Sequence, residues 1–536
     1  MAKGYLCLQL HAHLPFVRHP EYESFLEESW FYEAIIETYV PLLEVYESLV
    51  NDGIDFKITM SLTPPLCEMF ADPLLQNRFI NKLNMLIELS NKELHRTKGT
   101  DFYNTALMYH NKLNNCYDVF VNKYNKNLIN GFKKFQDMGK LEIITCSATH
   151  GFMPFMSINK NAVNAQIEIA VNNYIKHFGK TPFGIWNAEC AYYPGLEDFL
   201  RKWGLRYFFI DTHGILYAEK RPKYGIFAPL YCKNGVAVFG RDVESSKQVW
   251  SAQEGYPGDP DYREFYRDIG FDLPLDYIGP YIHHDGIRVM TGFKYYRITG
   301  RNMDKEPYNL EWAQNKVKIH AANFKFNREK QIEYLCSIMD REPIILAPYD
   351  AELFGHWWYE GPDFINQLCR EIHNSNIVKM ITPSEYLKKY PVNQVSTPAM
   401  SSWGNKGYME VWLNGGNDWI YRHYHECADK MVELANKFPD TTDPLLKRVL
   451  NQMARELLIA QTSCWAFIMT TNTTVEYAIR KVKTHLFRFL ELYRMVNENK
   501  INEDFLKECE FRDTIFQEID YMAYSDEHTY NRGFFK

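Results

Sequence analysis

The chain has 536 residues, of which 46% are hydrophobic and 24% charged, and these proportions are ordinary for a globular protein with about two or three structural units. Its formal net charge of −7 argues against a nucleic-acid partner, and no apolar stretch approaches the length of a membrane span. The eleven cysteines include no C-x-x-C pair, which predicts reduced thiols and a cytoplasmic location.

Short apolar runs recur along the chain, and most of them end in a polar side chain that can do chemistry. Helical patterns such as Trp30–Val50 and Ala162–His177 separate several of these runs. Strand–helix alternation with functional groups at the strand ends is typical of a parallel α/β barrel, although an open doubly wound sheet also alternates. The candidate strands are Gly4–Leu10, Phe56–Leu62, Leu141–Cys146, Phe183–Trp186, Arg206–Ile210, Val236–Phe239 and Pro343–Pro348.

Two regions break the alternation. Residues 71–137 have helical patterns rich in Asn and Lys, which predicts a helical insertion in a barrel domain formed by residues 1–395. From about residue 410 the strand signals vanish, while Asp443–Met469 and Thr474–Val496 have helical periodicity. We therefore expect residues 400–536 to form a C-terminal helical domain that contributes aromatic residues to the cleft.

Two carboxylates follow predicted buried strands. Asp350 lies in APYDAELFGHWWYEGP, and Glu189 lies in GIWNAECAYYPG. A single Glu at such a position can simply cap a helix or face solvent. Two carboxyls that flank a glycosidic bond, however, are the standard apparatus of glycoside chemistry, in which one attacks or assists and the other protonates the leaving oxygen. The spacing does not say which residue has which role.

Three histidines are candidates for the same site. His11 and His13 alternate in HAHLPF and so share one face of an extended strand, and His150 follows another predicted strand. With an aspartate they could bind zinc, as in a zinc-dependent carbohydrate deacetylase. No H-x-x-x-H or H-E-x-x-H spacing is present, and neutral histidines also serve as donors to sugar hydroxyls.

Tryptophans gather in segments rich in Gly, Asn and Ser. Trp357 follows Asp350, and Trp403 and Trp412 lie in SSWGNKGYMEVWLN. Such indole faces can stack on pyranose rings, but the same residues can instead form an interface between barrel and helices. Ser246–Pro274, which is dense in aromatics, Gly and Pro, is predicted to be a long ordered loop over a site.

Taken together, HAHLPF, CSATHGFMPF, WNAECAYYPG, APYDAELFGHWWYEG, SSWGNKGYMEVWLN and QTSCWAFIMTTNTTVEYA resemble glycoside hydrolase family 57, and within it the branching-enzyme-like group. The resemblance implies an incomplete parallel (β/α)7 barrel with a helical insertion and a C-terminal α-helical domain. It also implies a retaining mechanism on α-1,4-glucans that uses no metal or cofactor.

The resemblance carries over to individual residues. It implies that Glu189 is the nucleophile and Asp350 the general acid/base. His11, His13 and His150 match residues that line the sugar subsite beside the cut bond. Finally, Trp357, Trp403 and Trp412 match aromatic positions near the substrate.

Three departures from the family pattern concern function. Asn187-Ala188 stands where many members have Leu-Pro, and Cys464 stands where branching members typically have Asp, which puts one acceptor-side hydrogen bond in doubt. Gly235–Gln248, before Val249, is compact and has no tyrosine, whereas branching members carry a mobile loop there with a tyrosine thought to shield the glycosyl-enzyme from water. Without it, water can compete with the sugar acceptor.

The leading hypothesis is thus a 1,4-alpha-glucan branching enzyme that acts on amylose, glycogen or maltooligosaccharides. The alternative of the same family is an α-amylase or 4-α-glucanotransferase, and the remote alternative is the zinc-dependent deacetylase. A glycogen-binding protein with an inactive site is disfavoured because both carboxylates and all three histidines are kept. Oligomeric state does not follow from the sequence.

Overall fold

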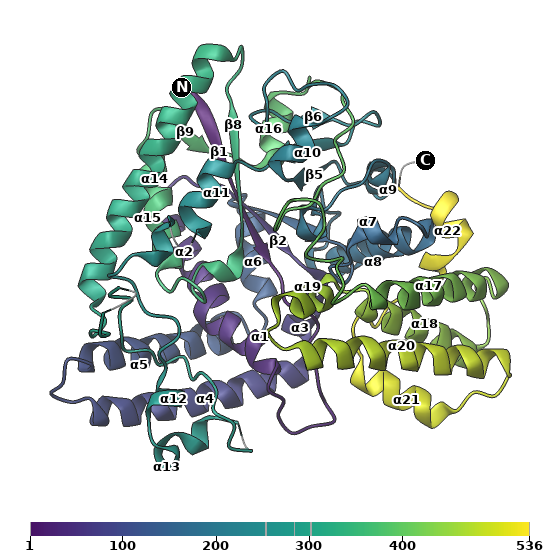
Figure 1. Ribbon diagram of the computed structural model, residues 1–536, viewed down its shortest axis with the longest axis horizontal. Coiled ribbons are helices and arrows are strands. Elements are labelled where there is room, and N and C mark those ends of the chain that lie inside the picture. Colours follow the sequence, from purple (N-terminus) through teal and green to yellow (C-terminus); the bar gives the residue numbers. More distant parts are fainter. Residues whose placement is uncertain (1, 252–253, 284, 301–302, 535–536) are drawn as a thin grey trace.

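A nine-stranded sheet, with seven parallel strands along its main path, forms the centre of the computed structural model, which describes residues 2–251, 254–283, 285–300 and 303–534 (Figure 1). The strands follow the order β7, β5, β4, β3, β2, β1, β8, and each overlaps one predicted apolar run. Their bounds are β1 (Gly4–Ala12), β2 (Ile58–Leu62), β3 (Leu141–Cys146), β4 (Gly184–Trp186), β5 (Tyr207–Ile210), β7 (Ala237–Gly240) and β8 (Ile344–Asp350).

The strands β7 and β8 are not paired with each other, and only a short contact joins the two sides of the barrel there. Arg241, directly after β7, forms a parallel bridge with Leu346, and the Asp242 N–H donates a hydrogen bond of 2.9 Å to the Leu346 carbonyl. The sheet is therefore an incomplete barrel, as predicted. Two short strands were not predicted: β6 (Leu230–Tyr231) runs antiparallel to β7, and β9 (Val378–Met380) pairs in parallel with β1.

Helices cover the outside of the sheet, as parallel strands that are buried on both faces require. The predicted helix Trp30–Val50 is interrupted in the structure, because a π-helical turn, Ile35–Tyr39, separates α1 (Glu28–Ala34) from α2 (Val40–Asn51). The other helices of this part are α3 (Pro64–Ala71), α7 (Met153–Met156), α8 (Lys160–Phe178), α9 (Leu196–Lys202), α10 (Thr212–Leu216), α11 (Val243–Trp250), α12 (Ile269–Asp272), α13 (Leu275–Ile278), α14 (Leu310–Ile338), α15 (Gly361–His373) and α16 (Pro383–Lys389).

Between β2 and β3 the chain forms α4 (Pro73–Arg96), α5 (Tyr103–Tyr117) and α6 (Ile129–Asp137). The long helices α4 and α5 lie side by side at one end of the molecule (Figure 1). The domain limits 1–395, 71–137 and 400–536 stay predictions. In the described ranges, no helix combines the length and the apolar character that crossing a bilayer requires.

The C-terminal part is helical, and its helices pack beside α8 (Figure 1). The helical periodicity of Asp443–Met469 is confirmed, although Gln461 and Thr462 divide the segment into two helices. Thr462 has an extended backbone (φ −59°, ψ 125°) and forms an antiparallel bridge with Gly151, in the loop after β3. The helices are α17 (Trp419–Lys437), α18 (Pro444–Ala460), α19 (Ser463–Thr471), α20 (Val475–Asn497), α21 (Glu503–Arg512) and α22 (Asp526–Tyr530).

Candidate active site

The predicted site residues lie at the carboxyl ends of the parallel strands. His11 lies in β1 and His13 follows it, while Asp350 is the last residue of β8 and is paired in register with His11. His150 follows β3, and Glu189 follows β4. Because parallel strands all end at the same edge of a barrel, side chains from distant parts of the sequence meet there.

Glu189 is held in an unusual backbone conformation by residues from the C-terminal third of the chain. Its φ of 64° and ψ of 25° are left-handed, which costs about 1–2 kcal/mol for a residue with a side chain. Its carboxylate is 8% exposed and accepts hydrogen bonds from Trp403 Nε1 at 2.8 Å and Ser463 Oγ at 3.0 Å. The Trp403 backbone N–H also donates to the Glu189 carbonyl at 2.9 Å. These bonds fix where the carboxylate points.

Both candidate carboxyls have raised pKa values. Burial raises the pKa of Asp350 to about 6, against a lowering effect of the Arg241 charge. Burial also raises the pKa of Glu189 to about 7, opposed by the hydrogen bond from Trp403, and the charge of Asp350 raises it further. The ionised form of Asp350 therefore disfavours ionisation of Glu189.

The hydrogen bonds and the pKa values differ on which of the two carboxyls ionises more easily. Trp403 and Ser463 donate to Glu189 and thus favour its anion, whereas Asp350 accepts no side-chain hydrogen bond from the described residues. The pKa of Glu189 is nevertheless the higher of the two in the sugar-free chain. The donors to Glu189 are fixed parts of the structure, so this carboxyl is the one built to be stabilised as an anion.

The three predicted histidines form one stack. The rings of His13 and His150 lie 3.7 Å apart between centroids and 11° from parallel, and His11 lies between His150 and the buried Trp186 ring, at 5.1 and 4.8 Å. Burial lowers the pKa of each histidine, to about 3 for His150. The rings are therefore neutral at physiological pH and can both donate and accept hydrogen bonds.

Hydroxyl and thiol groups orient these rings. The ring nitrogen contacts are His11 Nδ1 to Ser61 Oγ at 2.8 Å, His11 Nε2 to His150 Nε2 at 3.0 Å, His150 Nδ1 to Ser463 Oγ at 2.7 Å, His13 Nδ1 to Thr63 Oγ1 at 3.1 Å and His13 Nε2 to Cys464 Sγ at 2.9 Å. Ser463 thus joins the histidine stack to Glu189, so the helix that begins there completes the site.

Glu352 holds the backbone of His13 and the side chain of Tyr39 in place. Its Oε1 accepts the backbone N–H of His13 at 3.1 Å and the phenol of Tyr39. Burial raises the pKa of Glu352 to about 8, and the charge of Asp350 adds to this effect. Glu352 is therefore mainly protonated at neutral pH and acts as an uncharged clamp on the His13 backbone.

The three predicted tryptophans occupy different environments. Trp403 bonds to Glu189 and packs edge-on against Trp186, at 5.1 Å between centroids. Trp412 is 1% exposed and stacks on Phe152, and its indole N–H lies close enough to Glu189 to lower the carboxyl pKa. Trp357 is 55% exposed and stacks on Phe265, so it offers a free ring face.

The segment around α11 differs from the prediction in part. Ser246–Pro274 was expected to be a loop throughout, but its first residues belong to α11, and residues 252–253 lie outside the described residues. Only two residues separate β7 from α11, so the compact form of Gly235–Gln248 is confirmed. Arg241 lies at this junction, and its Nε donates a hydrogen bond of 2.9 Å to Ser246 Oγ.

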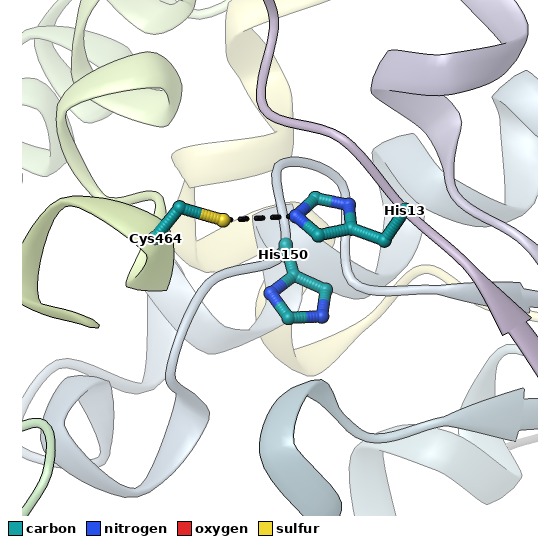
Figure 2. A group of neighbouring side chains, drawn as sticks. All are labelled: His13, His150 and Cys464. Carbon is teal, nitrogen blue, oxygen red and sulfur yellow. Dashed lines mark hydrogen bonds between the residues drawn. The ribbon is translucent and has the colours of Figure 1, made fainter. Parts of the chain in front are cut away.

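Sequence reasoning missed Ser463, Trp186 and Tyr39 as members of the site. Each lay inside a quoted motif or a predicted helix, but no spacing rule links Ser463 to Glu189 across 274 positions. Of the two groups of described residues that could hold a metal ion, one lies in this site: His13, His150 and Cys464 each offer a ligand atom, and these atoms lie within 4.8 Å of one another (Figure 2). The aspartate expected for a deacetylase is not part of this group.

Comparisons with known proteins agree with this architecture. A family model described as glycosyl hydrolase family 57 matches residues 7–398, and one described as 1,4-alpha-glucan branching enzyme, C-terminal, matches residues 423–524. A 1,4-alpha-glucan branching enzyme of Thermococcus kodakarensis is 34% identical over 98% of this chain and 79% of its own length.

Two solved structures superpose along nearly the whole chain. An alpha-amylase of Thermotoga maritima has a TM-score of 0.92 and 47% identity, over 97% of this chain and 99% of its own. A branching enzyme of Pyrococcus horikoshii has a TM-score of 0.88 and 32% identity, over 100% and 99% of the two chains. With its barrel, its paired carboxyls and a family model that spans most of its length, the chain belongs to glycosyl hydrolase family 57.

Proposed function

We propose that the protein is a 1,4-alpha-glucan branching enzyme, which cleaves an α-1,4 bond, holds the released chain on Glu189 and transfers it to a 6-hydroxyl. The observation that carries this proposal is the hydrogen-bonded, buried Glu189 carboxylate together with a second, half-buried carboxyl, Asp350, whose charge raises the pKa of Glu189. The relatives named as branching enzymes support the choice of reaction. Amylose, glycogen and maltooligosaccharides are the proposed substrates.

The reaction proceeds in two displacements. Asp350 gives its proton to the glycosidic oxygen while a Glu189 oxygen attacks the anomeric carbon, and the bond to the leaving sugar breaks. The acceptor hydroxyl then gives its proton to the Asp350 carboxylate as its oxygen displaces Glu189. Two inversions retain the configuration, and we expect a separation of about 5–5.5 Å between the carboxyls. No metal or cofactor enters these steps.

The surrounding residues have supporting roles in this scheme. Trp403 and Ser463 stabilise the Glu189 anion before attack and as it re-forms. The stack of His11, His13 and His150 lines the sugar subsite in this scheme, and because its rings are neutral it adds no charge that would lower the pKa of Asp350. The free face of Trp357 is the proposed stacking surface for a glucose ring.

Hydrolysis is the second candidate, and a specific feature favours it. The direct junction from β7 to α11 leaves no room for a shielding loop with a tyrosine. Water then reaches the glycosyl-enzyme more easily, and the product is a shortened chain with a new reducing end. The relative that is 47% identical is named an alpha-amylase, which agrees with this alternative.

We also infer a cytoplasmic location and two structural domains. All eleven cysteines are free thiols, and nine of them are buried, as expected for a protein that folds in a reducing compartment. Residues 1–395 are proposed as the catalytic barrel with the helical insertion 71–137, and residues 400–536 as the helical domain that supplies Trp403, Trp412 and Ser463.

The roles of the carboxyls are tested with a maltooligosaccharide that carries a good leaving group. Asp350→Asn should still form the glycosyl-enzyme, because such a leaving group needs no proton, but should release it slowly. Intact-mass measurement should then detect one added glucan chain, and digestion should place it on Glu189. Glu189→Gln should show no adduct. An adduct on another residue, or none in Asp350→Asn, would contradict the assignment.

The reaction itself is tested with amylose. Proton NMR measures new α-1,6 linkages, and a parallel assay measures new reducing ends. Abundant α-1,6 signal with few reducing ends supports branching, whereas reducing ends without α-1,6 signal select the hydrolytic candidate. If neither appears and Glu189→Gln behaves like the wild type, action on α-glucan is refuted.

A further inference from the structure

The group formed by His13, His150 and Cys464 combines two imidazoles and a thiol in one place, and the three come from segments far apart in the sequence (Figure 2). Imidazole nitrogen and thiolate sulfur are the ligands that zinc prefers. We infer that this group is an inhibitory site for one Zn²⁺ ion, which binds in place of sugar. Of the described residues, two clusters have the composition for a metal, and only this one borders Glu189.

The distances are close to those of a metal site. His13 Nε2 and Cys464 Sγ lie 2.9 Å apart, and all three ligand atoms lie within 4.8 Å of one another. Bonds of about 2.0–2.3 Å in a tetrahedron place ligand atoms roughly 3.3–3.8 Å apart. The ligand atoms therefore need shifts of about 1 Å, and the stacked His13 and His150 rings must also tilt so that their in-plane lone pairs meet at one ion.

The ring nitrogens are already oriented by neighbours, as in established metal sites. Thr63 Oγ1 contacts His13 Nδ1 at 3.1 Å and leaves Nε2 directed at the thiol. Ser463 and His11 contact the two nitrogens of His150 at 2.7 and 3.0 Å, so one of these contacts is given up when the ion binds. Outer partners of this kind fix the ring orientation of metal-binding histidines.

The ion can reach this group, because His13 and Cys464 are partly exposed although His150 is buried. Of the eleven cysteines, only Cys464 and Cys336 are partly exposed. The second cluster, Glu456, His485 and Asp513, is fully buried and already compensated, since Arg488 forms ion pairs with both carboxylates. That cluster has no need of a cation.

The bound ion inhibits because its ligands belong to the proposed sugar site and border Glu189. The thiol loses its proton to solvent as the Zn–S bond forms, and neutral imidazole nitrogens supply the other two bonds. Glu189 Oε1 lies 3.6 Å from His150 Nδ1, so it is placed to become a further ligand and is then unable to attack sugar. The inhibition rests on the proposed function, whereas the binding does not.

The test uses Co²⁺ as a spectroscopic substitute for Zn²⁺. Titration of the full-length protein should produce a thiolate-to-cobalt charge-transfer band in the near ultraviolet at about one ion per chain. Zn²⁺ should then abolish the band by competition. Cys464→Ser should lose the band and weaken Zn²⁺ binding by more than about tenfold. Cys336→Ser is the matched control and should keep both.

Each result decides a separate claim. Absence of the band in wild type, or its persistence in Cys464→Ser, overturns the site. If the band behaves as expected but Zn²⁺ leaves glucan cleavage unchanged, the inhibitory role is refuted and the binding site stands. If the protein has no action on glucan, the proposed function fails while the cobalt titration still reports on the site. If sugar and ion bind at the same place, added maltooligosaccharide should compete with Co²⁺ and weaken the cobalt band.

Discussion

The indole N–H of Trp403 is the feature whose removal tests the electrostatics of the site most directly. Trp403→Phe deletes the donor that lies 2.8 Å from Glu189 Oε2 but keeps an aromatic ring against Trp186. A hydrogen bond to a charged group contributes about 1.5–3 kcal/mol, and its loss corresponds to roughly 1–2 pKa units. The donor favours the anion, so its loss raises the Glu189 pKa above its present value of about 7.

The expected result is a shift of the acidic limb of the kcat/KM–pH profile to higher pH by about 1–2 units. The limb moves upward because the proposed mechanism requires Glu189 to be ionised when it attacks. At a pH below this limb, kcat/KM should fall by about 10- to 150-fold relative to wild type. The assay measures reducing ends and α-1,6 linkages from amylose at each pH, with the fold checked by circular dichroism.

Trp312→Phe is the matched control, because Trp312 is half-exposed on α14. Its profile should coincide with that of the wild type. If the acidic limb of Trp403→Phe stays in place in a folded protein, Trp403 acts only through its ring and the electrostatic argument is refuted.

Three further changes have defined outcomes. Gly355 has a φ of +115°, and a Cβ there would overlap the Glu37 carbonyl oxygen, so Gly355→Ala should lose about 2–5 kcal/mol of stability, while Gly415→Ala, with open space around it, should lose far less. Glu352 has a pKa raised by burial to about 8, so it stabilises the fold fully below roughly pH 4.5 and this stability is lost as pH rises through about 8; the melting temperature of Glu352→Gln should decline less over that window. An equal decline in both proteins would contradict this. Cys464→Asp replaces a thiol with a stronger hydrogen-bond acceptor next to the proposed position of the sugar hydroxyl that receives the chain. The ratio of α-1,6 linkages to reducing ends should therefore increase. An unchanged ratio would show that another residue sets the balance between transfer and hydrolysis.

The strands were predictable from the sequence because each one is buried on both faces and so forms a continuous apolar run. Gly4–Leu10 and Pro343–Pro348 are examples, and the polar residues that follow them lie at the same barrel edge. β6 and β9 were not predictable, because two or three residues carry no periodicity.

The departures from prediction lie mostly beside the site. The break between α18 and α19 was missed because Gln461 and Thr462 contain neither Gly nor Pro, and the bridge of Thr462 with Gly151 that stabilises it is a tertiary contact. The left-handed backbone of Glu189 was not predictable either, since local propensity opposes it. The Trp412 ring is buried and stacks on Phe152, and the sequence pattern does not distinguish such a packed ring from one that faces a sugar.

The position of Ser463 has a consequence for the timing of synthesis. Strands from the first 350 residues supply the histidines and both carboxyls, but Ser463 and the helix it begins must arrive before Glu189 has its second donor. At 5–20 residues per second, the ribosome adds Ser463 roughly 20–90 s after the first residue. A nascent barrel is therefore synthesised before either side-chain donor to the Glu189 carboxylate, Trp403 or Ser463, has been added, and the proposed nucleophile gains these two hydrogen bonds only when the C-terminal segments dock.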